Sequence, residues 1–142
     1  MNFWNFEYTI DVDLKHQIMF GKIYGIWKKD TAESYAEELK ETAKPLIKKP
    51  WVKLMDLTNW KIAHQEVIQI VGDLNRWCRK NNMVWAVYII NERASYNQLM
   101  KMLTKGDYHD IGKTFRSRNE AEKFLKEHGF SVPKLDDSGL FK

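Results

Sequence analysis

The fold is decided by residues 50–71, PWVKLMDLTNWKIAHQEVIQIV, in the middle of the chain. Residues 52–57 are mostly apolar and rich in β-forming side chains, which predicts a buried strand. Residues 58–61 follow as a predicted loop. From about residue 63 to about residue 81, apolar side chains recur at helical spacing and predict an amphipathic helix. Ligands of open α/β sheets bind at such strand ends, so the search for a function starts here.

Two strands and a helix are expected before this stretch. Residues 6–12 and 16–27 alternate apolar and polar side chains, and the short polar link between them predicts an antiparallel hairpin. Gly21 and Gly25 interrupt the second strand, which indicates a bulge or the close approach of another backbone. A helix with one apolar face is expected to begin at Asp30 and to end before Pro50.

Strands and helices alternate after this stretch. Residues 83–90, MVWAVYII, are apolar throughout, so we expect a strand that is buried on both faces and parallel to its neighbours. A helix over about residues 94–104, a short strand over about residues 111–115 and a last helix follow. Ser117 and Glu120 have the spacing of a capping box at the start of that last helix.

These elements predict the fold class α/β. The order is β-β-α-β-α-β-α-β-α, which gives a single-domain mixed β-sheet with a leading antiparallel hairpin, then parallel strands, and four helices. The domain is expected to span residues 1–130. A polar C-terminal tail is expected over residues 131–142.

The length and composition fit one soluble globular domain. The chain has 142 residues, of which 44% are hydrophobic and 30% are charged. Its 23 basic and 19 acidic side chains give a net charge of +4 without a basic cluster, so we expect no nucleic-acid partner. The longest apolar run is far shorter than the roughly 20 residues that span a bilayer, so we expect no membrane partner.

The expected location is the cytoplasm. The first residues, MNFWNFEY, lack the basic leader and apolar run of a signal peptide. Cys78 is the single cysteine of the chain, so no intrachain disulfide can form. Both features are typical of proteins in a reducing compartment.

Three short stretches carry a family resemblance: residues 22–30, KIYGIWKKD; residues 54–59, LMDLTN; and residues 115–125, FRSRNEAEKFL. Together with the element order they resemble the STAS domain (sulphate transporter and anti-sigma-factor antagonist), and most closely the small bacterial anti-sigma-factor-antagonist-like proteins. The first stretch resembles the family's second strand and the aspartate that opens its first helix. The second resembles its third strand and Asp-Leu-Ser turn, and the third resembles a capped last helix. The resemblance covers about residues 6–129 and implies a STAS-like fold.

The resemblance also implies where a regulatory switch would lie. The family's switch is a Ser or Thr at the N-terminus of the second helix, where a phosphate meets free backbone N–H groups and the positive end of the helix dipole. Counting from Asp56, this position falls near Gln65 and Glu66, and neither side chain carries a hydroxyl. The chain is therefore expected to keep the scaffold and to lack the usual phosphoacceptor Ser.

We expect a non-enzymatic regulatory or protein-interaction module. The expected contact surface joins the loop after the third strand to the start of the next helix, and comprises Thr58, Trp60, Lys61, His64, Gln65 and Glu66. Trp60 is the expected anchor, because an exposed tryptophan often dominates the binding energy of an interface. The alternative is that Trp60 folds back over the sheet edge. A homodimer is also plausible, because the apolar N-terminal end and the first strand need cover.

The alternative function is the binding of a small apolar ligand. The chain contains 6 Met, 6 Trp, 6 Tyr and 7 Phe, and ligand pockets are lined mainly by apolar side chains. The expected pocket lies between the second helix, the third helix and the sheet, lined by Trp77, Trp85, Met100 and Leu103. A tightly packed interior at these residues would contradict this alternative.

Patterns for catalysis and metal binding are weak. The chain has no Gly-rich phosphate loop, nucleophile elbow or zinc-helix motif. Residues 107–110, DYHD, include metal-binding side-chain types, but no further ligands converge with them in the sequence. We expect no enzymatic activity, no catalytic residues, no metal and no cofactor.

Overall fold

The computed structural model describes residues 8–61, 65–105 and 110–133, except the side chains of residues 94–95 and 102–105. Over these ranges the elements follow the predicted order. They are β1 (Tyr8–Asp13), β2 (Ile18–Gly25), α1 (Lys29–Ala43), β3 (Trp51–Trp60), α2 (Gln65–Lys80), β4 (Met83–Ile89), α3 (Arg93–Lys105), β5 (Gly112–Phe115) and α4 (Arg118–Glu127).

The described strands form one mixed sheet in the order β1-β2-β3-β4-β5. β1 pairs antiparallel with β2, and β2, β3, β4 and β5 pair in parallel. The predicted fold class is therefore confirmed. β4 has a strand on each side, as its unbroken apolar sequence predicts.

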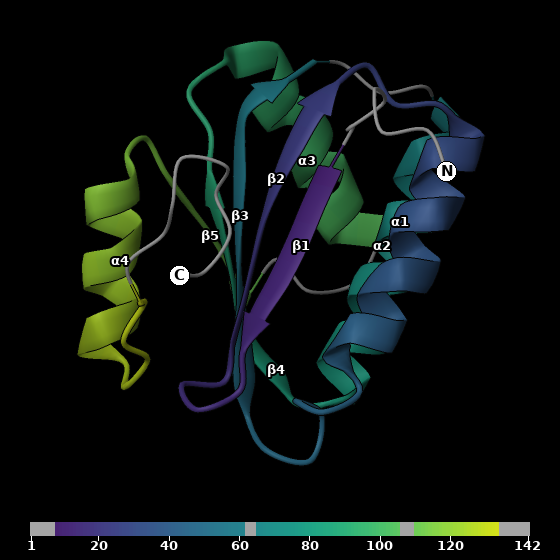
Figure 1. Ribbon diagram of the computed structural model, residues 1–142. Coiled ribbons are helices and arrows are strands. Elements are labelled where there is room, and N and C mark those ends of the chain that lie inside the picture. The colour runs from purple at the N-terminus through teal and green to yellow at the C-terminus, as the bar shows by residue number, and fades with distance from the viewer. Residues whose placement is uncertain (1–7, 62–64, 106–109, 134–142) are drawn as a thin grey trace.

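The helices lie in two unequal layers. α1, α2 and α3 cover one face of the sheet, and α4 lies on the other (Figure 1). Two groups of buried side chains fill the space between these layers. The larger contains Tyr35 of α1, Leu74 of α2 and Leu99 of α3, whereas the smaller contains Ala121 and Leu125 of α4.

Alternation along β3 divides its side chains between the two layers. Val52 and Leu54 belong to the core under α4, and Trp51 and Met55 belong to the core under the three helices. Lys53 lies between Trp51 and Met55 in this alternation and is only 2% exposed. A charged side chain thus points into the three-helix core from the central strand.

Amide side chains hold the amino edge of the parallel sheet, where β2, β3 and β4 begin. Gln17 and Asn82 precede β2 and β4 with φ angles of 58° and 75°, which Asn tolerates better than most residues. The Gln17 amide donates to the carbonyl of Leu46 at 2.9 Å, and the Asn82 amide donates to the carbonyl of Ile47. Both therefore fix the connection between α1 and β3.

The ends of the described chain agree in part with the predictions. The Ser117 cap within the predicted capping box is confirmed: Ser117 Oγ accepts from the backbone N–H of Glu120 at 3.3 Å and donates to the Glu120 carboxylate at 3.0 Å. The polar tail expected over residues 131–142 stays a prediction; within its described part, Val132 packs against the core under α4. Residues 134–142 lie outside the described part of the chain.

Two further expectations concern partners. β1 is an edge strand, as the expected homodimer would require, but the dimer stays a prediction. Within the described ranges, none of the helices combines the length and the apolar character that crossing a membrane requires.

Substitution of Gly21 tests how closely β1, β2 and β3 pack at this position. A Cβ atom at this position would lie 2.3 Å from the backbone oxygen of Thr9 and 2.8 Å from Met55 Sδ. The Met55 side chain can move, but the Thr9 oxygen belongs to the paired strand. We expect Gly21→Ala to lower the free energy of unfolding by about 1–3 kcal/mol. Urea denaturation measures this change. An unchanged denaturation midpoint would contradict this close approach.

Candidate functional site

The carboxyl edge of the parallel strands is where four connections meet. β2, β3, β4 and β5 all end at this edge, and a helix follows each of them. Helix N-termini at this edge present free backbone N–H groups and a partial positive charge. In open α/β sheets, ligands bind outside the carboxyl ends of the strands. A site is therefore expected here on topological grounds.

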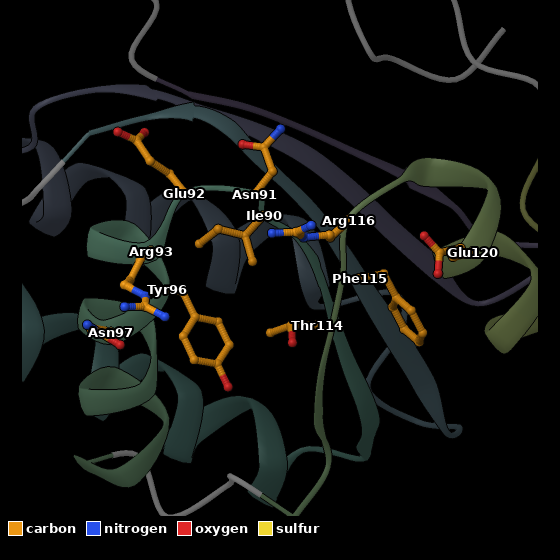
Figure 2. Close-up of a pocket in the computed structure, with 10 residues that line it drawn as sticks. All are labelled: Ile90, Asn91, Glu92, Arg93, Tyr96, Asn97, Thr114, Phe115, Arg116 and Glu120. Atoms are coloured by element: carbon orange, nitrogen blue, oxygen red, sulfur yellow. The ribbon is translucent and has the colours of Figure 1, made fainter.

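A pocket of about 630 Å³ opens at this edge between the β4–α3 and β5–α4 connections (Figure 2). Most of the side chains that line it are polar or charged and exposed. They are Ile90, Asn91, Glu92, Arg93, Tyr96, Asn97, Thr114, Phe115, Arg116 and Glu120. The pocket is thus a surface depression that combines amides, hydroxyls, two guanidinium groups and two carboxylates.

The two arginines enter the pocket from different connections. Arg93 is the first residue of α3, and Arg116 directly follows β5. In Figure 2, Arg116 extends toward Ile90 and the guanidinium of Arg93 lies beside Tyr96. Among the described residues, neither arginine forms an ion pair with a carboxylate. Both guanidinium groups are therefore available to bind an anion, which they can do in a bidentate manner.

The surroundings of the arginines add hydrogen-bond donors. Tyr96 is 41% exposed, and its ring and Thr114 lie near the centre of the pocket in Figure 2. The first turn of α3 contains no acidic residue, but Glu92 directly precedes this helix and lines the pocket. Glu120 lines it as well, and its carboxylate accepts a hydrogen bond from Ser117. Two carboxylates therefore accompany the two guanidinium groups, which form the cationic part of the pocket.

The predicted contact surface differs from the observed one at Trp60. β3 continues through residues 58–60, which the sequence predicts to be a loop, because β2 pairs with them: Gly25 is the register partner of Trp60. Trp60 is only 3% exposed, so its expected role as an exposed anchor is wrong. Its burial agrees with the alternative that it covers the core at the sheet edge.

The other described residues of the predicted contact surface differ in how far they are exposed. Thr58 is half-buried, and its hydroxyl donates to the Asp56 carboxylate at 2.7 Å. Lys61, Gln65 and Glu66 are exposed. α2 begins at Gln65, so Gln65 and Glu66 occupy its first turn, and the expected lack of a phosphoacceptor there stays a prediction. His64 lies outside the described residues.

The three described residues of the predicted apolar pocket do not all come together. Trp77 and Met100 pack against the core under the three helices. Trp85 lies on the opposite face of the sheet, where its ring centroid is 5.0 Å from that of Phe124. A register shift at the start of β4 sets this orientation, which the unbroken apolar run of β4 does not reveal. The side chain of Leu103 lies outside the described part of α3.

Sequence reasoning missed a polar cluster under α2. Lys53 Nζ donates to Asn75 Oδ1 at 3.2 Å and lies 5.8 Å from the centroid of the Tyr88 ring. Burial opposes the charged form of Lys53, but Tyr88, Tyr35 and Cys78 outweigh it and hold the pKa of the ammonium above its ordinary value. The alternation of residues 51–57 could have revealed this cluster, because Lys53 occupies an inward-facing position of the strand between apolar neighbours.

Cys78 lies beside this cluster and is fully buried. Burial raises the pKa of its thiol, and the nearby Lys53 ammonium only partly opposes this effect. A buried thiol with a raised pKa is a poor nucleophile. Among the described residues, no group of three or more His, Cys, Asp or Glu side chains could hold a metal ion. Residues 107–109 lie outside the described ranges.

Comparison with known proteins identifies the fold. No protein-family model and no curated protein matches the chain. A solved structure matches with a TM-score of 0.61 and 15% sequence identity, covering 83% of this chain and 91% of the other. That protein is an uncharacterized member of the DUF3478 family with a SpoIIAA-like fold, from Shewanella loihica PV-4. The fold is SpoIIAA-like. The STAS-like architecture predicted from the sequence is therefore confirmed, and at this identity the likeness shows the fold alone.

Burial of Trp60 predicts how the expected contact surface responds to mutation. We expect Trp60→Ala to lower the free energy of unfolding by about 3–5 kcal/mol, because it empties a large buried volume. We expect Lys61→Glu, at the next and exposed position, to change it by less than about 0.5 kcal/mol. Urea denaturation of both variants measures the difference. Equal stability of the two variants would contradict the burial of Trp60.

The capping box of α4 also gives a prediction, because it directly follows Arg116. We expect Ser117→Ala to lower the free energy of unfolding by about 1 kcal/mol, since it removes the acceptor of the Glu120 N–H. Ser117→Asp is the matched control, because aspartate also caps helices and should retain most of the stability. Thermal unfolding followed by circular dichroism compares the three proteins. A loss of similar size in both variants would contradict capping as the role of Ser117.

Proposed function

We propose that this chain is a non-enzymatic protein-interaction module that recognises an anionic group of a protein partner in the pocket at the carboxyl edge of its sheet. The observation that carries the proposal is the pair of exposed arginines, Arg93 and Arg116, which face one pocket and form no described ion pair. The recognised group is a carboxylate or a phosphate on the partner. Both match the bidentate geometry of guanidinium.

The chemistry of the pocket supports binding rather than catalysis. Guanidinium groups stay protonated at all physiological pH values, so Arg93 and Arg116 can hold and orient an anion but cannot transfer a proton. Tyr96, Thr114 and the amides of Asn91 and Asn97 add neutral hydrogen-bonding groups. Such a set determines which anionic group fits and in which orientation.

The residue types at the pocket also support a protein partner. Tyrosine and arginine are among the residues that most often dominate the energy of protein interfaces. Tyr96 is one of the large hydrophobic side chains that remain exposed, and it lines the pocket together with the two arginines. In this proposal Tyr96 replaces Trp60 as the anchor of the module. The surface formed by Lys61, Gln65 and Glu66 lies at the same edge of the sheet and would add peripheral contacts.

The experiment uses synthetic peptides and fluorescence anisotropy. The peptides carry glutamate, phosphoserine or phosphotyrosine at the centre, each paired with a neutral peptide that has glutamine, serine or tyrosine instead. We expect the wild-type protein to bind at least one anionic peptide more tightly than its neutral pair. We expect Arg93→Gln and Arg116→Gln each to weaken that binding about ten-fold or more, because a hydrogen bond to a charged group contributes about 1.5–3 kcal/mol.

Arg76→Gln is the matched control, because it removes the same charge from an exposed position on α2, where Arg76 pairs with Asp73. We expect this variant to bind like the wild-type protein. Equal weakening by all three substitutions would indicate a general charge effect and would contradict the pocket as the contact site. Wild-type binding that does not distinguish anionic from neutral peptides would contradict recognition of an anion.

A further inference from the structure

The pocket at the carboxyl edge presents negative as well as positive charge. Glu92 directly precedes α3, where its backbone carbonyl accepts a hydrogen bond from the N–H of Tyr96 at 2.9 Å. Glu120 lies in the first turn of α4. Both carboxylates are exposed and line the pocket. Together with the two arginines they make the pocket neutral overall, although the chain as a whole has a net charge of +4.

The charged side chains of the pocket do not neutralise one another by direct pairing. None of the ion pairs among the described residues includes Glu92 or Glu120, and the same holds for the two arginines. The Glu120 carboxylate accepts a hydrogen bond from the Ser117 hydroxyl at 3.0 Å, but this neutral donor leaves the charge in place. Both signs of charge are therefore presented to a group that enters the pocket.

The two carboxylates lie on opposite sides of the pocket. Figure 2 shows Glu92 beside the start of α3 and Glu120 on α4, with Arg116 between them. The strand order causes this separation, because Glu92 belongs to the β4–α3 connection and Glu120 to the helix that follows β5. An anionic group bound by the arginines consequently has a carboxylate on either side.

This arrangement affects which partner segments fit. Exposed charges interact over roughly 8–10 Å at physiological ionic strength. A segment that carries only acidic residues is attracted by the arginines and repelled by the carboxylates. A segment that carries a cation beside its anionic group is attracted by both sets of charges. The carboxylates thus discriminate against the first kind of segment and in favour of the second.

We infer that the partner segment carries a lysine or arginine within a few residues of its carboxylate or phosphate. Arg93 and Arg116 bind the anionic group, and Glu92 and Glu120 bind the basic side chains that flank it. This inference rests on the proposed function and adds to it the charge pattern of the partner.

The first measurement uses the wild-type protein, so it does not depend on the folding of any variant. Synthetic peptides keep the central glutamate, phosphoserine or phosphotyrosine that binds best, and a single lysine replaces glutamine at each flanking position in turn. We expect fluorescence anisotropy to show about two- to five-fold tighter binding for at least one lysine position, which is the size of the effect of an exposed ion pair. The net positive charge of the protein opposes this gain, so the gain would come from carboxylates near the bound peptide.

Glu92→Gln and Glu120→Gln test whether these carboxylates belong to the pocket. Each substitution removes one charge and keeps the shape of the side chain. We expect at least one of the two variants to lose the gain from lysine. Glu127→Gln is the matched control, because it removes an exposed carboxylate at the end of α4 that does not line the pocket. This variant should retain the whole gain.

The results distinguish failure of this inference from failure of the proposed function. A wild-type protein that prefers anionic peptides but binds them equally with and without lysine would overturn the inference and leave the proposed function intact. A gain from lysine that persists in both pocket variants would also overturn the inference, because the carboxylates would then serve only to stabilise the starts of their helices. Wild-type binding that does not distinguish anionic from neutral central residues would overturn both.

Discussion

Each parallel strand of this sheet lies beside the strand that precedes it in the sequence, and connections between parallel strands are almost always right-handed. These two constraints together place α1, α2 and α3 on one face and leave the other face to α4 (Figure 1). They also bring the carboxyl ends of four strands to one edge. The deep core and the exposed pocket are therefore both consequences of the same step-by-step strand order.

The two layers have different chemistry because of this asymmetry. Side chains that point toward the three helices are covered deeply enough to surround the Lys53 ammonium with Asn75 and two tyrosines. Under α4 the described buried set is apolar, and aromatic contacts such as that of Trp85 with Phe124 support it. A charge is thus accommodated where α1, α2 and the neighbouring strand β4 each provide a polar side chain.

Periodicity and capping signals predict the element order, the sheet and the α4 capping box, because these depend on short-range patterns in the chain. The position of Trp60 could not be predicted in the same way. Its burial depends on pairing with Gly25, thirty-five positions earlier, and on the resulting extension of β3. The face occupied by Trp85 likewise depends on a register shift between β3 and β4 that leaves no local trace.

The candidate pocket was not predicted, because its parts are ordinary when they are taken separately. An arginine at the start of a helix and an arginine after a strand are common surface residues. Arg93 and Arg116 gain significance only because β4 and β5 are neighbours, which brings their connections around one depression. The start of α2 was predictable, since the helical spacing of apolar side chains from about residue 63 agrees with its start at Gln65.

The hydrogen bonds of Gln17 and Asn82 at the amino edge have a consequence for the evolution of such domains. These side chains bind the α1–β3 connection through its own carbonyl groups, so a change in loop length at that end would break contacts on which the strand starts depend. We therefore expect the connections at the opposite, carboxyl edge of the sheet to tolerate changes in length better than the α1–β3 connection does.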